Sequence, residues 1–107
     1  MSKALDKDPA IFDVLDRLRL RLGSDCFVVT DHWEPDLCAV GISSPSNPGV
    51  LVYISTYNES PNRYGYELET PPPAGSDALY EVAGRGSDIS FEELANVVAD
   101  HLSRADQ

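Results

Sequence analysis

Apolar residues near the start of the chain recur at helical spacing. They fall at i, i+4, i+7 and i+11 and so line one face of a helix; they are Ile11, Leu15, Leu18 and Leu22. Asp8 is a suitable N-cap and Pro9 suits the first helical position, while Gly23 is a natural stop. The pattern therefore predicts a helix over residues 9–22.

Four short apolar segments follow, separated by spacers that are rich in turn residues. They predict strands at residues 26–31, 38–42, 50–57 and 63–69. The third segment has the strongest strand signal, so we expect it to be central in a sheet. Three prolines at 71–73 end the last strand. The segment from Leu79 to Val82 fits either a fifth strand or part of a helix.

A second helix is predicted near the C-terminal end of the sequence. Ser90 and Glu93 have the spacing of a capping box, in which Ser90 is the N-cap and Glu93 reaches back to it. Ile89 and Leu94 occupy the two positions of a hydrophobic staple. The apolar stripe of this helix consists of Phe91, Leu94, Ala95, Val98 and Leu102.

The order of these elements indicates an α+β fold with two layers: a helix, an antiparallel sheet of four to five strands, and a helix. Short connections favour a meander, because parallel pairing needs long crossovers. Two helices with one apolar stripe each would cover one face of that sheet. Residues 1–107 are expected to form a single domain, with fraying at 1–8 and 104–107. Gly84, Arg85 and Gly86 are expected to form a flexible turn, and the order of residues 74–88 stays open.

The charge of the chain is strongly negative and unevenly distributed. The formal net charge is −10. Residues 1–22 carry five basic and four acidic side chains, whereas residues 23–100 carry 13 acidic side chains against Arg63 and Arg85, a local balance of −11. Such a field repels nucleic acid and anionic membranes and attracts a basic protein partner.

The hydropathy pattern contains no membrane signal. No apolar run approaches the ~20 residues that a membrane helix requires. Asp6, Asp8, Asp13 and Asp16 interrupt every stretch that could serve as a signal peptide. The expected compartment is therefore the cytoplasm.

The hairpin between the third and fourth predicted strands indicates a possible binding face. A five-residue loop at 58–62 sets Tyr57 opposite Arg63, Ser55 opposite Gly65 and Tyr53 opposite Glu67. Alternation then places Val52, Ile54, Tyr66 and Leu68 on a core face, and Tyr53, Tyr57, Arg63, Glu67 and Glu69 on the other. Tyrosines beside carboxylates suit the docking of cationic groups. The alternative is an ordinary solvated sheet face.

A second candidate contact lies at residues 31–36, which hold the only tryptophan, a histidine and several carboxylates. Trp33 and Glu34 suit a contact loop in which the indole is the anchor. The alternative is an acidic turn whose tryptophan packs against the sheet. The candidate partner-binding residues are therefore Tyr53, Tyr57, Glu67 and Glu69, together with Trp33 and Glu34.

Catalytic and metal chemistry have weaker support in the sequence. Asp31 and His32 form half of an acid–base pair, but no serine or cysteine lies in a nucleophile motif. Cys26, Cys38, His32 and His101 share no metal-ligand spacing, so neither a metal nor a cofactor is expected. The two cysteines are expected to be buried small hydrophobes. A small enzyme or ligand-binding domain around Asp31, His32 and Cys38 remains an alternative.

Three segments carry a resemblance to a known family: residues 51–56 (LVYIST), residues 64–69 (YGYELE), and the helix from Glu93 to Leu102. From about Ala39 to Leu102 this layout resembles the small acidic immunity proteins of bacterial polymorphic or contact-dependent toxin systems. The resemblance implies a cytoplasmic binder that occludes a toxin domain, often a basic nuclease, and it transfers no catalytic residues.

Besides the small enzyme or ligand-binding domain, two functional hypotheses follow from the sequence. The leading one is a non-enzymatic, acidic protein-binding domain of the immunity type. The alternative is a homodimeric structural or assembly subunit, joined through an uncovered sheet face or an edge strand.

Overall fold

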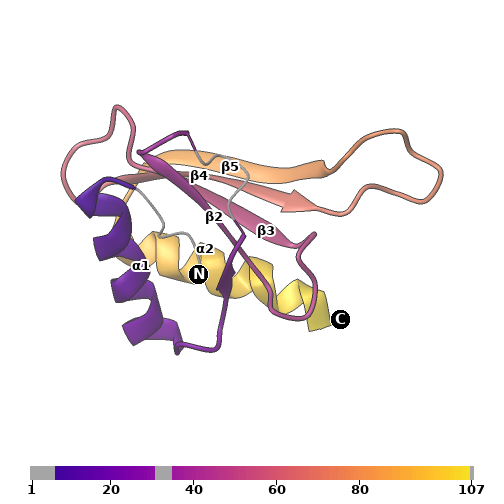
Figure 1. Ribbon diagram of the computed structural model, residues 1–107, viewed down its shortest axis with the longest axis horizontal. Coiled ribbons are helices and arrows are strands. Elements are labelled where there is room, and N and C mark those ends of the chain that lie inside the picture. The colour runs from indigo at the N-terminus through magenta and orange to yellow at the C-terminus, as the bar shows by residue number, and fades with distance from the viewer. Residues whose placement is uncertain (1–6, 31–34, 107) are drawn as a thin grey trace.

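The computed structural model describes residues 7–30 and 35–106 (Figure 1). Helix α1 (Pro9–Leu22) precedes five strands, and helix α2 (Phe91–Ser103) and a short 3₁₀ helix, η1 (Arg104–Asp106), follow them. The strands are β1 (Val28–Val29), β2 (Ala39–Ser43), β3 (Leu51–Ser55), β4 (Tyr64–Thr70) and β5 (Glu81–Ile89).

The strands form one antiparallel sheet in which every strand pairs with its neighbour in the sequence, in the order β1-β2-β3-β4-β5. Helix α2 runs beneath this sheet and α1 lies at one end of it, on the same side (Figure 1). The predicted fold class, an α+β domain with an antiparallel meander, is confirmed. The fifth strand begins at Glu81, so Leu79 and Tyr80 lie in the loop before it.

One apolar core lies between the helices and the sheet. Val52 and Ile54 of β3 are fully buried in it, and Tyr66 and Leu68 of β4 pack against it, as the alternation predicts. Fully or almost fully buried apolar residues of the helices are Ile11, Val14, Leu15, Leu18, Leu94, Ala95, Val98 and Leu102.

The helix ends agree with the sequence in position but not in every cap. Asp8 occupies the N-cap of α1, yet its side chain makes no capping hydrogen bond. Its carboxylate instead accepts a hydrogen bond from the Cys38 thiol at 3.0 Å. Ser90 caps α2 by accepting from the Glu93 amide at 3.2 Å. The Glu93 carboxylate accepts from the Ser90 hydroxyl at 3.4 Å, so the return bond of the expected capping box is made to the hydroxyl.

The expectation of a flexible turn at residues 84–86 is wrong, because these residues lie within β5 and pair with β4. Gly86 is explained by the neighbouring strand. A Cβ added at Gly86 would lie 2.6 Å from Cε1 of Tyr66, so this strand position lies directly against the tyrosine ring. Glycine here permits a close side-chain approach within a strand rather than a turn.

The sheet face opposite the helices is less open than the sequence suggests. All five residues of β2 are buried, so this strand is covered on both faces. Leu51 and Glu69, which alternation places on that face, are 2% and 6% exposed. The chain before α1 is also anchored, since Lys7 Nζ donates to the Asp36 carbonyl at 2.7 Å and the Asp8 amide donates to the Leu37 carbonyl at 2.9 Å. Alternation gives the direction of a side chain, but not the segments that cover it.

Candidate functional site

A shallow depression lies where the sheet face opposite the helices remains accessible. Its centre is a row of three cross-strand neighbours: Tyr53 on β3 pairs with Glu67 on β4, which pairs with Arg85 on β5. Ser55 and Ser87 extend its lining, and its volume is about 370 Å³. We call these five residues the sheet-face site. The predicted pairing of Tyr53 with Glu67, and of Ser55 with Gly65, is confirmed.

The charges within the sheet-face site neutralise each other. Arg85 Nη2 lies 3.0 Å from Oε1 of Glu67, and the Glu67 side chain is only 26% exposed. Arg85 is not among the residues predicted for this site, because residues 84–86 were expected to form a turn. Glu67 can therefore meet a cationic group only by sharing or exchanging its arginine. Because the ion pair with Arg85 must be weakened or broken, Glu67 contributes less to the free energy of binding a basic partner.

Tyr53 is the aromatic member of the site. Its hydroxyl donates to Oδ2 of Asp36 over 3.5 Å. Burial raises the pKa of Tyr53, and the carboxylates of Asp36 and Glu67 add to this rise, while a hydrogen bond involving Ser55 opposes it. The phenol is therefore a neutral hydrogen-bonding group rather than a base at neutral pH.

The other predicted binding residues do not join this row. Tyr57 lies in the turn after β3, is 74% exposed and is outside the ladder, so its expected pairing with Arg63 is not formed. Glu69 is on the predicted face but is buried. Trp33 and Glu34 lie outside the described residues, as do Asp31 and His32.

A second hollow of about 490 Å³ lies at the far end of the same face, at the base of the β4–β5 hairpin. We call it the hairpin cavity, and its main lining residues are Pro48, Leu51, Glu69, Pro71, Leu79 and Tyr80. Leu79 and Tyr80 are not among the predicted site residues. The available signal was an apolar pair within a stretch of glycine, serine and aspartate, which has no core pattern of its own.

The arrangement around Cys38 does not support nucleophilic catalysis. The Asp8 carboxylate that accepts the thiol's hydrogen bond raises the pKa of Cys38, and burial and the charges of Asp8 and Asp36 raise it further. The thiolate is the reactive form, so this environment suppresses reactivity. In residues 7–30 and 35–106 no cluster of three or more histidine, cysteine, aspartate or glutamate side chains is arranged to hold a metal ion.

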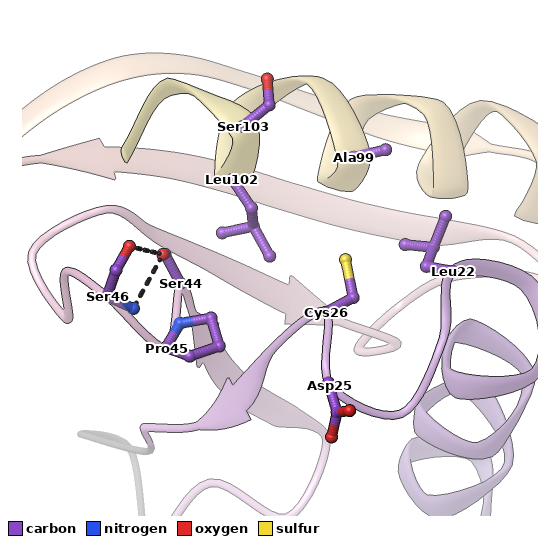
Figure 2. A pocket seen from close by; sticks show the side chains of 9 residues that line it. All are labelled: Leu22, Asp25, Cys26, Ser44, Pro45, Ser46, Ala99, Leu102 and Ser103. Atoms are coloured by element: carbon purple, nitrogen blue, oxygen red, sulfur yellow. Dashed lines mark hydrogen bonds between the residues drawn. The ribbon is translucent and has the colours of Figure 1, made fainter. Parts of the chain in front are cut away.

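A third hollow, of about 480 Å³, lies between the end of α1, the segment before β1 and the C-terminal half of α2 (Figure 2). The thiol of Cys26 points into it, between Leu22 and Leu102. Burial raises the pKa of Cys26. The hydroxyls of Ser44 and Ser46 lie 2.9 Å apart and hydrogen-bond to each other. Among residues 7–30 and 35–106, neither the Cys26 thiol nor the Ser44 hydroxyl is paired with a base.

Two further observations do not concern any single hollow. None of the helices within the described residues is long and apolar enough to span a bilayer. Comparison with known proteins finds no matching family model, no similar curated protein and no similar solved structure.

Proposed function

We propose that this chain is a non-enzymatic, acidic binding domain that captures a basic protein partner. The toxin-neutralising immunity protein, acting in the cytoplasm, is the specific form of this proposal that the sequence resemblance implies. Two observations support the proposal. The net charge is −10, and the arginines of the chain are already paired with its own carboxylates.

The observation that carries the proposal is that the arginines are paired within the chain. Each of the six lies near a carboxylate, at distances between 2.5 and 3.9 Å. In the part of the chain that the structure describes, the exposed acids Asp25, Asp77 and Glu81 have no ion pair. The excess negative charge is therefore presented to solvent, where it accelerates association with a positively charged surface.

The alternative functions have less support. An enzyme that uses Cys38 would have to work with a thiol whose pKa is raised. A homodimer is favoured by the position of β5 at one end of the strand order, where no further strand of residues 7–30 and 35–106 pairs with it. Two copies that each carry −10 repel one another, however, and this repulsion favours a basic partner over a second copy.

The test is capture of partners on the immobilised chain at low salt, followed by expression of the captured protein and measurement of its association rate. We expect a basic partner whose association slows strongly between about 0.01 M and about 0.1 M salt, as the screening length falls from about 30 to about 10 Å. Co-expression that relieves growth arrest by that partner would establish the immunity form. Capture of only a second copy, or an association rate independent of salt, would contradict the proposal.

A further inference from the structure

We propose that the tip and base of the β4–β5 hairpin, residues 70–82, form the docking surface for the basic partner. The surface accepts an extended segment in which an apolar side chain is flanked by lysine or arginine. This inference rests on the proposed function and adds to it the location of binding and the chemistry of the bound segment.

The first observation is apolar exposure at the hairpin. Leu79 is 91% exposed, and Tyr80 and Val82 are 46% and 43% exposed. The hairpin loop projects beyond the rest of the sheet at the end opposite α1 (Figure 1). Exposed apolar side chains that lie close together indicate a contact site, because a second surface that covers them removes their apolar area from water.

The second observation is the hairpin cavity beside these residues. Leu79 and Tyr80 form one wall of it, and Pro48, Leu51 and Pro71 contribute further apolar surface. Its volume of about 490 Å³ is sufficient for a large apolar side chain and part of the segment that carries it. The base of the hairpin is held close to the β2–β3 loop, since a Cβ at Gly49 would lie 2.7 Å from Cγ of Pro71. The cavity is thus bounded by two segments that pack against each other.

The third observation is the charge next to Leu79 and Tyr80 in the sequence. Asp77 and Glu81 are exposed on either side of Leu79 and Tyr80, and neither has an ion pair among the described residues. By contrast, Glu67 in the sheet-face site is neutralised by Arg85 at 3.0 Å. A cationic segment therefore finds available carboxylates at the hairpin, where it has no arginine to displace.

The combination selects the occupant. A cavity lined mainly by apolar residues, with Glu69 and Thr70 among them, attracts an apolar side chain, and the carboxylates of Asp77 and Glu81, which flank Leu79 and Tyr80 in the sequence, favour lysine or arginine beside it. A second copy of this chain fits less well, because its own hairpin presents the same two carboxylates and would place like charges together. The sheet-face site lies on the same face, two residues along β3 and β4 from the pair Leu51–Glu69, so one partner can cover both.

The test uses three capped peptides as probes, followed by amide NMR of the labelled full chain. One peptide alternates lysine with leucine, one alternates lysine with serine, and one alternates glutamate with leucine. We expect only the lysine–leucine peptide to shift the amides of residues 77–83. Leu79→Ser should weaken its binding about tenfold, the cost of losing one buried leucine side chain. The pair Asp77→Asn and Glu81→Gln should weaken it about threefold and reduce its salt dependence.

Matched control variants distinguish specific binding at this surface from nonspecific binding. Leu20 on α1 is 89% exposed, so Leu20→Ser removes an equally exposed leucine from the helix layer and should leave binding unchanged. Asp25→Asn removes an exposed, unpaired charge elsewhere and should have no local effect. Shifts that map outside residues 70–83 and the other residues that line the hairpin cavity, equal binding of the glutamate–leucine peptide, or equal effects of Leu20→Ser and Leu79→Ser would overturn the inference.

The outcomes also distinguish this inference from the proposed function. A captured basic partner that binds the hairpin variants like the wild type, but is lost on Tyr53→Ser with Glu67→Gln, refutes the hairpin and retains the function. Failure to capture any basic partner refutes the function, whatever the peptides show. Concentration-dependent dimers that disappear on Leu79→Ser would replace the basic segment with a second copy.

Discussion

The close contact between β4 and β5 allows a sharp test with two glycines of the same strand. Gly86 and Gly84 are both within β5, and neither has the positive φ that would exclude alanine. A Cβ at Gly86 would lie 2.6, 2.8 and 2.9 Å from Cε1, Cζ and the hydroxyl oxygen of Tyr66. At Gly84 the nearest atom would be Cδ1 of Leu68 at 3.5 Å, which is an ordinary contact.

The expected magnitudes follow from these distances. Gly84→Ala should stabilise the fold by about 0.4–1 kcal/mol, because alanine reduces the entropy of the unfolded chain. In Gly86→Ala the Tyr66 ring must move by about 1 Å to reach normal contact distance. Such overpacking costs about 1–3 kcal/mol, and the half-buried ring can yield toward solvent, so we expect a net loss of about 1 kcal/mol. The two variants should therefore differ by about 2 kcal/mol.

Thermal and urea unfolding followed by circular dichroism will measure the difference. A loss of about 1 kcal/mol lowers the melting temperature by roughly 4–8 °C in a domain of this size. The decisive control is Tyr66→Leu, which removes the three contacting atoms. In that background Gly86→Ala should lose its penalty. Equal stability of the two alanine variants, or a penalty that persists without the tyrosine ring, would refute the reasoning.

Three further predictions concern contacts outside the hairpin. Ser90→Ala should destabilise the protein by about 1 kcal/mol, because the Glu93 amide loses the hydroxyl that caps α2. Denaturant titration measures this loss of stability, and an unchanged unfolding midpoint would exclude a capping role for Ser90. Arg21 joins α1 to α2, because its Nη1 lies 2.7 and 2.5 Å from Oε1 and Oε2 of Glu92. Both side chains are exposed, so a double-mutant cycle should give a coupling free energy of only about 0.2–1 kcal/mol that decreases with salt. A coupling that does not depend on salt would contradict this prediction. In a variant that lacks the other cysteine, alkylation of Cys38 should require a higher pH than that of free cysteine. Asp8→Asn should lower that pH, and no effect of this change would remove Asp8 as the cause.

The raised thiol pKa of Cys38 also sets the sign of one stability effect. The unfolded chain loses its thiol proton first, near pH ~8.5, whereas the folded chain retains it to higher pH. The contribution of this thiol to stability is therefore fully present below that value and decreases as the pH rises through the folded pKa.

The helices and the central hairpin could be predicted from local sequence because local physics determines them. Pro9 and Gly23 delimit α1, and its bounds were predicted correctly. The register of Tyr53 with Glu67 follows from a short loop and the two-residue period of strands. Fold class followed from the same local signals, since short connections leave few topologies.

The remaining features depend on contacts between distant residues. β5 contains two glycines and several polar residues, so its sequence predicts a turn; pairing with β4 and the ring of Tyr66 make it a strand. Asp8 was expected to cap its own helix, but it bonds a thiol 30 positions away. The pairing of Glu67 with Arg85 required the position of β5, and therefore the neutral character of the sheet-face site was not available from the sequence.

The meander has a consequence for how the chain acquires its structure. Every strand pairs with its neighbour in the sequence, so the sheet can assemble through short, local loop closures, which favour rapid folding. The core beneath the sheet is nevertheless completed by α2, which follows all the strands and supplies Leu94, Val98 and Leu102. A nascent chain in which the strands have already paired would expose their apolar face until α2 is synthesised and docks. That interval is the stage of synthesis at which this protein most needs protection from aggregation.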